Sequence, residues 1–383
     1  MKRFSLIFLG ALAMFMAGCS KDNAQQTNPD AWVHDLSLPV PIQFGSPALL
    51  SKATTFNSLE DLAGHFMANS DDRLGVFGIA KNGVIDLDND ILLDNVKATV
   101  AIGSDGGYVV RLDDVKYYPR LSTQNFTFYG CYPRMTGRTF NESGSPVINV
   151  GSSDQNFSVK LGTTDILWAK AEATPFEYNG EPIDGYNAQY IRALRTSGNM
   201  QYSPKFHFEH VTAGLKFIAV GNDDGNNNTN DDFKGITINS VTVKQVCQVG
   251  KLDVMSGVIT PDNSLPGNVT DITQSCKKAP TLEGTDLCQF FPCPQEGGYT
   301  VEVSVTSSAN PQGYSITFNT GELQARKQYI YKLKFNKMDT VEIQVTGLDW
   351  TESEDFTVDT DTETPTPTPD NTTDESGDEG IDA

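Results

Sequence analysis

The fold is decided by the segment Phe206-His207-Phe208-Glu209-His210-Val211-Thr212-Ala213-Gly214-Leu215-Lys216-Phe217. Apolar residues occupy every second position at each end of it, first Phe206 and Phe208, then Leu215 and Phe217. Because successive side chains of a strand point to opposite faces of a sheet, this period of two predicts strands with one buried and one solvated face. Antiparallel sheets packed into β-sandwiches have this pattern.

The same alternation continues through the second half of the chain. Five further runs bring the number to seven, enough for one sandwich over residues 201–356: Ile236/Ile238, Val301/Val303/Val305, Tyr314/Ile316/Phe318, Tyr329/Tyr331/Leu333/Phe335 and Val341/Ile343/Val345. In the first half, apolar and aromatic runs bounded by Asn-Gly, Gly-Gly and Pro predict another sandwich over residues 36–200. We therefore expect an all-β fold of two antiparallel β-sandwich domains that meet near residues 196–204.

One short helix is expected among the strands, over residues 57–67. Its apolar positions keep the helical spacing, and Ser58 with Asp61 forms a start that resembles a capping box. The sequence otherwise predicts strands and turns.

Charge separates the body of the chain from its end. The 383 residues carry 49 acidic and 28 basic side chains, for a net charge of −21. This balance argues against nucleic acid as a partner, since phosphate backbones are bound by basic patches. Residues 351–383 contain twelve acids and no base, and residues 357–383, with their Thr-Pro repeat, are too polar to pack, so we expect a disordered acidic tail.

The beginning of the chain predicts export and lipid attachment. Lys2 and Arg3 precede an uncharged apolar run at residues 4–17, which is too short to span a membrane and ends in Met16-Ala17-Gly18-Cys19. We expect residues 1–18 to be a signal peptide cut between Gly18 and Cys19, and Cys19 to carry acyl chains that anchor the protein in the outer membrane. Residues 19–35 would then be a tether. An ordinary secretory signal peptide is the alternative.

The remaining cysteines predict disulfides in the second half. Four of the five lie close together, as Cys247, Cys276, Cys288 and Cys293, whereas Cys131 stands apart. An exported protein can form disulfides, and these four cysteines allow three pairings. A metal site is not expected, because no Cys-x-x-Cys pair or nearby histidine accompanies them.

Two other patterns resemble ligand sites but have simpler explanations. His207 and His210 lie three apart on a strand, so their side chains point to opposite faces and cannot bind one metal. His210 is on the same face as Phe206 and Phe208, and we expect it to pack at the edge of the core. Residues 86–90 and 222–226 resemble calcium loops, but both lack the glycine and the bidentate glutamate of an EF-hand, and Asx turns explain them equally well.

Nothing in the sequence argues for an enzyme. No nucleophile elbow, P-loop or dinucleotide-binding fingerprint occurs, so no catalytic residue, cofactor or metal ligand is assigned.

Several motifs, taken in order, resemble the fimbrillin family, the pilins and accessory proteins of Bacteroidales type V pili. The most specific is the segment 206–217, which is similar to the family's Phe-x-His-x-x-Ala-x-Leu-x-Phe strand. The other landmarks are the lipobox at Cys19, Ser51-Lys52-Ala53, Lys116-Tyr117-Tyr118-Pro119, Phe126-Thr127-Phe128-Tyr129-Gly130-Cys131-Tyr132-Pro133, Asp165-Ile166-Leu167-Trp168-Ala169, Gln328-Tyr329-Ile330-Tyr331-Lys332-Leu333 and Leu348-Asp349-Trp350.

The resemblance implies two transthyretin-like sandwiches and assembly by donor-strand exchange. Family members arrive as lipoproteins, and many lose their first strand to a trypsin-like protease, after which a neighbour's strand fills the vacated place. Here Val40, Ile42 and Phe44 share one face of a first strand, and the matching cut lies between Lys52 and Ala53, with Arg73 a less favoured site. The family's typical arginine is a lysine here.

The function expected is that of a structural and adhesive pilus subunit or accessory protein. Its partners would be other fimbrial subunits, outer-membrane lipid through Cys19, and ligands on host or bacterial surfaces. Its location would be the surface-exposed outer membrane and, after assembly, the fimbrium. Stalk, tip and anchor positions all stay open. The alternative is a stand-alone surface lipoprotein that binds glycan or protein through exposed aromatics and never polymerises.

Overall fold

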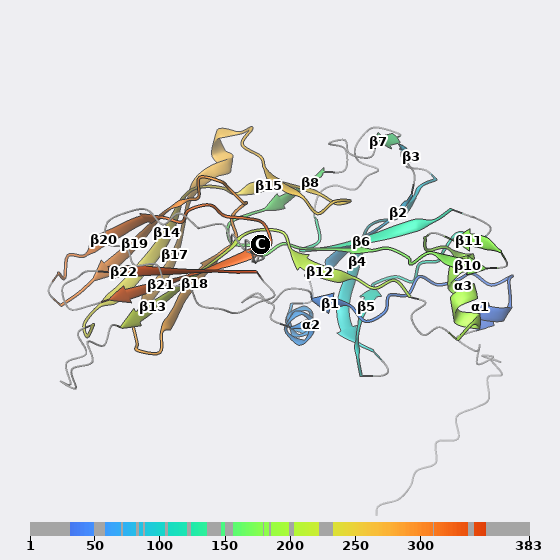
Figure 1. Ribbon diagram of the computed structural model, residues 1–383, viewed down its shortest axis with the longest axis horizontal. Helices are drawn as coiled ribbons and strands as arrows, with labels where there is room; N and C mark the ends of the chain where they lie inside the picture. Colours follow the sequence, from blue (N-terminus) through green and yellow to red (C-terminus); the bar gives the residue numbers. More distant parts are fainter. Residues whose placement is uncertain are drawn as a thin grey trace, which may run out of the picture.

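The computed structural model describes residues 31–349, except residues 50–57, 70–71, 82–83, 87–88, 104–105, 121–123, 136–146, 150–155, 179, 184, 199–202, 222–232, 309 and 336–340. Strands dominate this part of the chain, as Figure 1 shows, and the expected all-β fold is confirmed. None of the helices in the described ranges is both long and apolar enough to cross a membrane.

A seven-stranded sheet organises the first half, in the order β1-β12-β9-β6-β2-β4-β5. Its neighbours pair antiparallel except for β1 and β12, which are parallel. The strands are β1 (Ala48–Leu49), β2 (Leu74–Ala80), β4 (Ile91–Ile102), β5 (Tyr108–Leu112), β6 (Phe126–Tyr132), β9 (Leu167–Ala171) and β12 (His207–His210). Every residue of the two central strands β2 and β6 is buried, because both faces of the sheet are covered.

Helices and an extended segment cover one face of this sheet. Helix α2 (Leu59–Ala68) contributes Leu62, Ala63 and Phe66 to the core there, and α3 (Ala188–Thr196) contributes Ile191 and Leu194. Helix α1 (Ala31–His34) lies against α3. Small two-stranded sheets, β10 (Phe176–Tyr178) with β11 (Glu181–Ile183) and β3 (Val84–Asp86) with β7 (Val147–Asn149), complete the first half.

A three-stranded sheet covers the other face, in the order β16-β15-β8. It joins β8 (Asn156–Lys160) to β15 (Val249–Asp253) and β16 (Ile259–Pro261), so two of its strands come from the second half of the chain. The indole N–H of Trp168 in β9 donates to the Val254 carbonyl oxygen at 2.8 Å across this buried layer. The two sheets share one apolar core and form a sandwich.

The second half contains a sandwich of two four-stranded sheets, drawn at the opposite end of the molecule from α1 and α3 in Figure 1. One sheet has the order β18-β13-β21-β22 and the other β17-β14-β19-β20, and their inner faces share a single core. The strands are β13 (Gly214–Gly221), β14 (Thr237–Cys247), β17 (Val269–Lys278), β18 (Thr285–Phe290), β19 (Thr300–Thr306), β20 (Tyr314–Asn319), β21 (Lys327–Phe335) and β22 (Val341–Asp349).

The predicted helix is present, but it is not alone. Helix α2 begins where expected, with the Ser58 hydroxyl accepting from the Asp61 N–H at 3.1 Å, whereas α1 and α3 are additional helices. The tether expected up to residue 35 is corrected at its end, because α1 buries Trp32 and Val33 in the core. Strand β12 lies beyond the boundary expected near residue 200 yet pairs in the first sheet. The acidic tail lies outside the described residues.

Candidate functional site: the first segment and the face it covers

Residues 40–49, here called the first segment, run across the covered face of the seven-stranded sheet. Val40, Ile42 and Phe44 are each at most 6% exposed, whereas Gln43 is exposed. This alternation places three side chains in the core from one short extended piece of chain, as the sequence predicted.

The backbone of the first segment is held at its two ends. At the first end, the Ile42 N–H donates to the Lys116 carbonyl oxygen at 2.8 Å, and the Tyr118 N–H donates to Val40 at 2.9 Å. Towards the other end, the Gly45 N–H donates to the Pro204 carbonyl oxygen at 2.9 Å and the Ala48 N–H to the Phe206 carbonyl oxygen at 2.8 Å, and β1 continues as a two-residue parallel strand on β12. The first segment is thus an edge element, held by a short ladder at each end.

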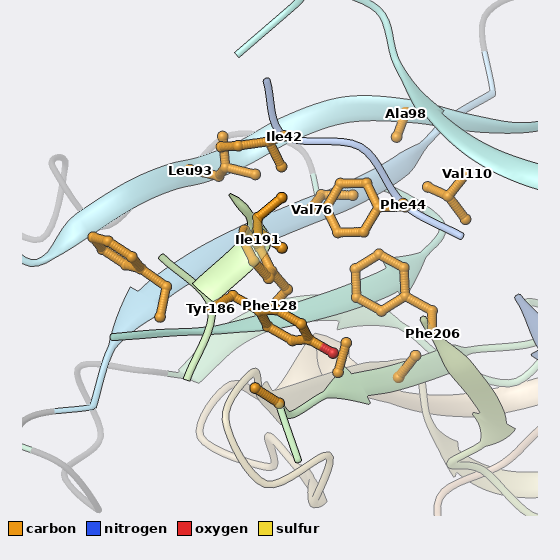
Figure 2. Close-up of a cluster of buried hydrophobic side chains, with 14 of the residues drawn as sticks. Ile42, Phe44, Val76, Leu93, Ala98, Val110, Phe128, Tyr186, Ile191 and Phe206 are labelled. Carbon is orange, nitrogen blue, oxygen red and sulfur yellow. The ribbon is translucent and has the colours of Figure 1, made fainter. Parts of the chain in front are cut away.

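An aromatic cluster forms the centre of the contact. The ring of Phe44 stacks on Phe206 with centroids 4.8 Å apart and meets Phe128 edge-on at 5.2 Å. Figure 2 shows Phe44 facing Phe206, with Ile42 beside Leu93 of β4. Gly130 in β6 leaves room for these rings, because a Cβ there would come within 3.4 Å of both Phe206 and Phe208. Such pairs add about 0.5–1.5 kcal/mol each beyond the area that they bury.

Arg192 of α3 fastens the chain ahead of the first segment. Its guanidinium donates to the carbonyl oxygens of Trp32, at 3.0 Å, and Leu38, at 2.6 Å. Desolvation by burial, together with the nearby Arg120, lowers the pKa of Arg192. Sequence reasoning missed this residue, and the helical spacing of apolar residues in 188–194 was the signal for the helix that carries it.

The arrangement favours strand binding rather than catalysis. Burying Val, Ile and Phe side chains contributes roughly 1.5–3 kcal/mol each, and only a few backbone bonds accompany them. If the first segment were removed, the core side chains and the edge carbonyl groups that it covers would face water. A replacement strand with alternating apolar side chains would satisfy both.

The predicted processing and lipid sites lie outside the described residues. This applies to Gly18 and Cys19 and also to Lys52 and Ala53, which fall between β1 and α2. Arg73, the less favoured cleavage site, is described. It pairs with Asp113 at 3.2 Å and donates to the Asp72 carbonyl oxygen at 2.7 Å, directly before β2. A cut there would fall at the start of a central strand.

The histidine prediction is confirmed. His210 is fully buried, with its Nδ1 2.7 Å from Oδ1 of the equally buried Asp165, whereas His207 is exposed. No group of three or more metal-ligating side chains occurs in the described parts of the chain. Around Asp86 the described groups bond to one another in a turn, with the Asp86 N–H donating to the Asp90 carboxylate at 2.8 Å and the Asp90 N–H donating to the Asp86 carbonyl oxygen at 2.7 Å. Residues 222–226 lie outside the described ranges.

The five cysteines after Cys19 are all free thiols. Cys131 is buried in β6, where its thiol donates to the carbonyl oxygen of Gly75 in the neighbouring β2 at 3.6 Å. The other four are described below. Their pairing stays a prediction.

One protein-family model and several solved structures are similar to this chain. A protein-family model described as fimbrillin-like matches residues 63–350. The structure of a candidate cell adhesion protein from Bacteroides uniformis ATCC 8492 is 17% identical with a TM-score of 0.47, covering 82% of this chain and 99% of that one. A fimbrial protein from Bacteroides vulgatus ATCC 8482 is 10% identical with a TM-score of 0.42, covering 81% and 100%. No curated protein sequence matches.

Proposed function

This chain belongs to the fimbrillin-like family, and from that premise we propose that it is a structural, adhesive subunit or accessory protein of a pilus, assembled by donor-strand exchange. We assign it no catalytic activity. The family match supports a role at the cell surface among other fimbrial subunits.

One observation supports the assembly mechanism: the first segment supplies three core side chains from a piece of chain with few backbone bonds, made by Val40 and Ile42, by Gly45 and by Ala48 with strand β1. A cut after Lys52 would separate it from α2 and everything that follows. Without the first segment, the apolar burial of its three side chains is lost, at roughly 1.5–3 kcal/mol each. The cut form therefore gains free energy by accepting a strand from a neighbour, and because such contacts run head to tail, they build a fibre.

Anchoring precedes assembly in this proposal. Export, cleavage before Cys19 and acylation of its thiol would hold the protein on the outer membrane until the protease acts. The two sandwiches would remain as the folded units of the fibre, the first of them including β12, β15 and β16 from beyond residue 200.

Limited trypsin digestion tests the mechanism. We expect the monomer to become a species that begins at Ala53, which then associates into oligomers resistant to mild detergent. Lys52→Gln should block both steps, whereas Lys52→Arg, which trypsin still cuts, should leave them unchanged. N-terminal sequencing and non-boiled gels provide the two readouts. Equal oligomerisation of the Lys52→Gln variant, or cleavage at Arg73 instead, would contradict strand removal.

The alternative of a stand-alone binder with exposed aromatics finds less support. Of the large apolar side chains that are exposed in the described ranges, one is aromatic, Tyr117, at 48% exposure. A persistent monomer after cleavage at Lys52 would nevertheless favour that alternative.

A further inference from the structure

The edge where the chain passes between the two sheets of the second sandwich carries a pair of thiols. Strands β17 and β18 are the edge strands of opposite sheets and follow each other in sequence. Each pairs with its own inner neighbour, β17 with β14 and β18 with β13. The seam between β17 and β18 is therefore closed by side chains rather than by a backbone ladder.

Three side chains on one face of β17 reach across this seam. Gln274 and Lys278 both bond to β18, and Cys276 between them packs against the core on the same side, past an irregularity of the strand at Lys277. The Gln274 amide donates to the Gln289 carbonyl oxygen at 2.5 Å, and the Lys278 ammonium donates to the Asp286 carbonyl oxygen at 2.5 Å. Between these two contacts, the Cys276 thiol donates to the Gln274 carbonyl oxygen at 3.6 Å, and it lies near enough to the Cys288 thiol for each to be the main cause of the other's shift in pKa.

The environment of Cys276 and Cys288 favours thiol–disulfide exchange. Both thiols are half-buried at the border of the apolar core, so neither is sealed from reagents. The hydrogen bond from Cys288 and the charge of Lys278 favour the thiolate of Cys276 and lower its pKa to about 7, whereas the pKa of Cys288 is raised because its proton is shared with Cys276. One member of the pair is thus suited to start thiol–disulfide exchange.

We propose that Cys276 and Cys288 form a disulfide that joins β17 to β18 and closes this edge of the second sandwich. Of the three pairings open from sequence, the structure favours the one that includes this contact. Cys247 donates to the Val249 carbonyl oxygen, and the buried Cys293 lies against the Ile259 carbonyl oxygen, both away from the seam. The proposal is independent of strand exchange.

The exchange needs an oxidant that is itself a disulfide, such as oxidised glutathione or a thiol oxidoreductase. The Cys276 thiolate attacks one sulfur of that disulfide, forms a mixed disulfide and releases the first thiolate. Cys288 then loses its proton to water and attacks the Cys276 sulfur, which releases the second thiolate. Two electrons pass from the cysteine pair to the oxidant, and each released thiolate takes up a proton.

Peptide mapping of the full chain tests the pairing. The reduced protein is incubated with oxidised glutathione, alkylated with N-ethylmaleimide and digested with trypsin and chymotrypsin. Trypsin sites at Lys244, Lys251 and Lys277 and a chymotrypsin site after Phe290 put each of the four cysteines on its own fragment. We expect a linked pair of fragments carrying Cys276 and Cys288, lighter than the reduced pair by two hydrogens.

Two variants serve as controls. Cys276→Ser should abolish the linked fragment and also the upward shift in Tm that oxidation gives the parent protein. Cys247→Ala should retain both. A link from Cys276 or Cys288 to any other cysteine, or four alkylated thiols in the oxidised and folded parent protein, would overturn the proposal.

Discussion

The first segment and strand β21 both supply core side chains, yet they are held in different ways. Strand β21 lies inside its sheet, with nine residue pairs to β22 and eight to β13. Strand β1, the regular part of the first segment, makes two residue pairs with β12, and Pro41 adds an isolated bridge to Tyr117. The burial of side chains is similar, with Tyr331 and Phe335 fully buried in β21 and Phe44 6% exposed.

This difference shows which parts of an all-β protein can be exchanged. Side-chain burial without a continuous ladder gives a segment that contributes to stability but can leave as a unit. A central strand cannot leave without breaking two ladders along its whole length. Local opening free energies in proteins differ in this way, low at edges and close to the global value in central strands.

The largest effect on the free energy of unfolding is expected when a core side chain of the second sandwich is shortened. Phe217 of β13 is fully buried and stacks on Tyr331 with centroids 5.2 Å apart. Phe217→Ala should reduce the free energy of unfolding by about 3–5 kcal/mol, as large-to-small core changes do. Urea unfolding followed by tyrosine and tryptophan fluorescence measures it. Lys216→Ala, on the opposite face of the same strand, is the control and should cost less than about 1 kcal/mol. Equal costs would mean that this core is loosely packed.

A smaller and local effect is expected at the first segment. Phe44→Ala removes the stack on Phe206 and the edge contact with Phe128, so residues 40–49 should open more often while β21 stays protected. Hydrogen exchange should show faster exchange at the Ile42 and Ala48 amides, with amides of β21 unchanged. Gln43→Ala, an exposed neighbour, serves as the control. Uniform loss of protection across both regions would show that the first segment is not separable.

The sequence predicted best where one face of a strand is buried. The seven alternating runs of the second half fall on strands because their period of two is a local signal, and Ser58 with Asp61 marked the start of α2 for the same reason. In β2 and β6 the signal is a continuous apolar run instead, since both faces of that sheet are covered.

The rest depends on contacts between distant parts of the chain. Strand β15 pairs with β8 about ninety residues earlier, and no local pattern specifies that partner. Arg192 binds the backbone carbonyl groups of Trp32 and Leu38. Because every residue has a backbone carbonyl group, no side chain in the sequence marks these two residues as the partners of Arg192. The aromatic faces around Phe44 were predictable as buried, but not their mutual stacking.

The smallest expected effect is a difference in alkylation rate between two thiols, one from each region. Burial raises the pKa of Cys131, in β6 of the seven-stranded sheet, to about 12, whereas the pKa of Cys276 is lowered to about 7. In the reduced protein, N-ethylmaleimide should therefore modify Cys276 with a rate that rises through pH 7, while Cys131 stays unmodified until the fold opens. Because the folded-state pKa of Cys276 lies below its usual value, its ionisation adds a little stability at high pH, and that contribution is lost as the pH falls through about 7.

Lys278→Gln should move the midpoint of the Cys276 rate profile to higher pH, since the nearby positive charge is gone. Mass spectrometry of tryptic peptides 121–134 and 252–277 follows the two sites separately. Similar rates at both thiols, or a Cys276 midpoint near pH 9, would show that the contact between Cys276 and Cys288 does not favour the thiolate.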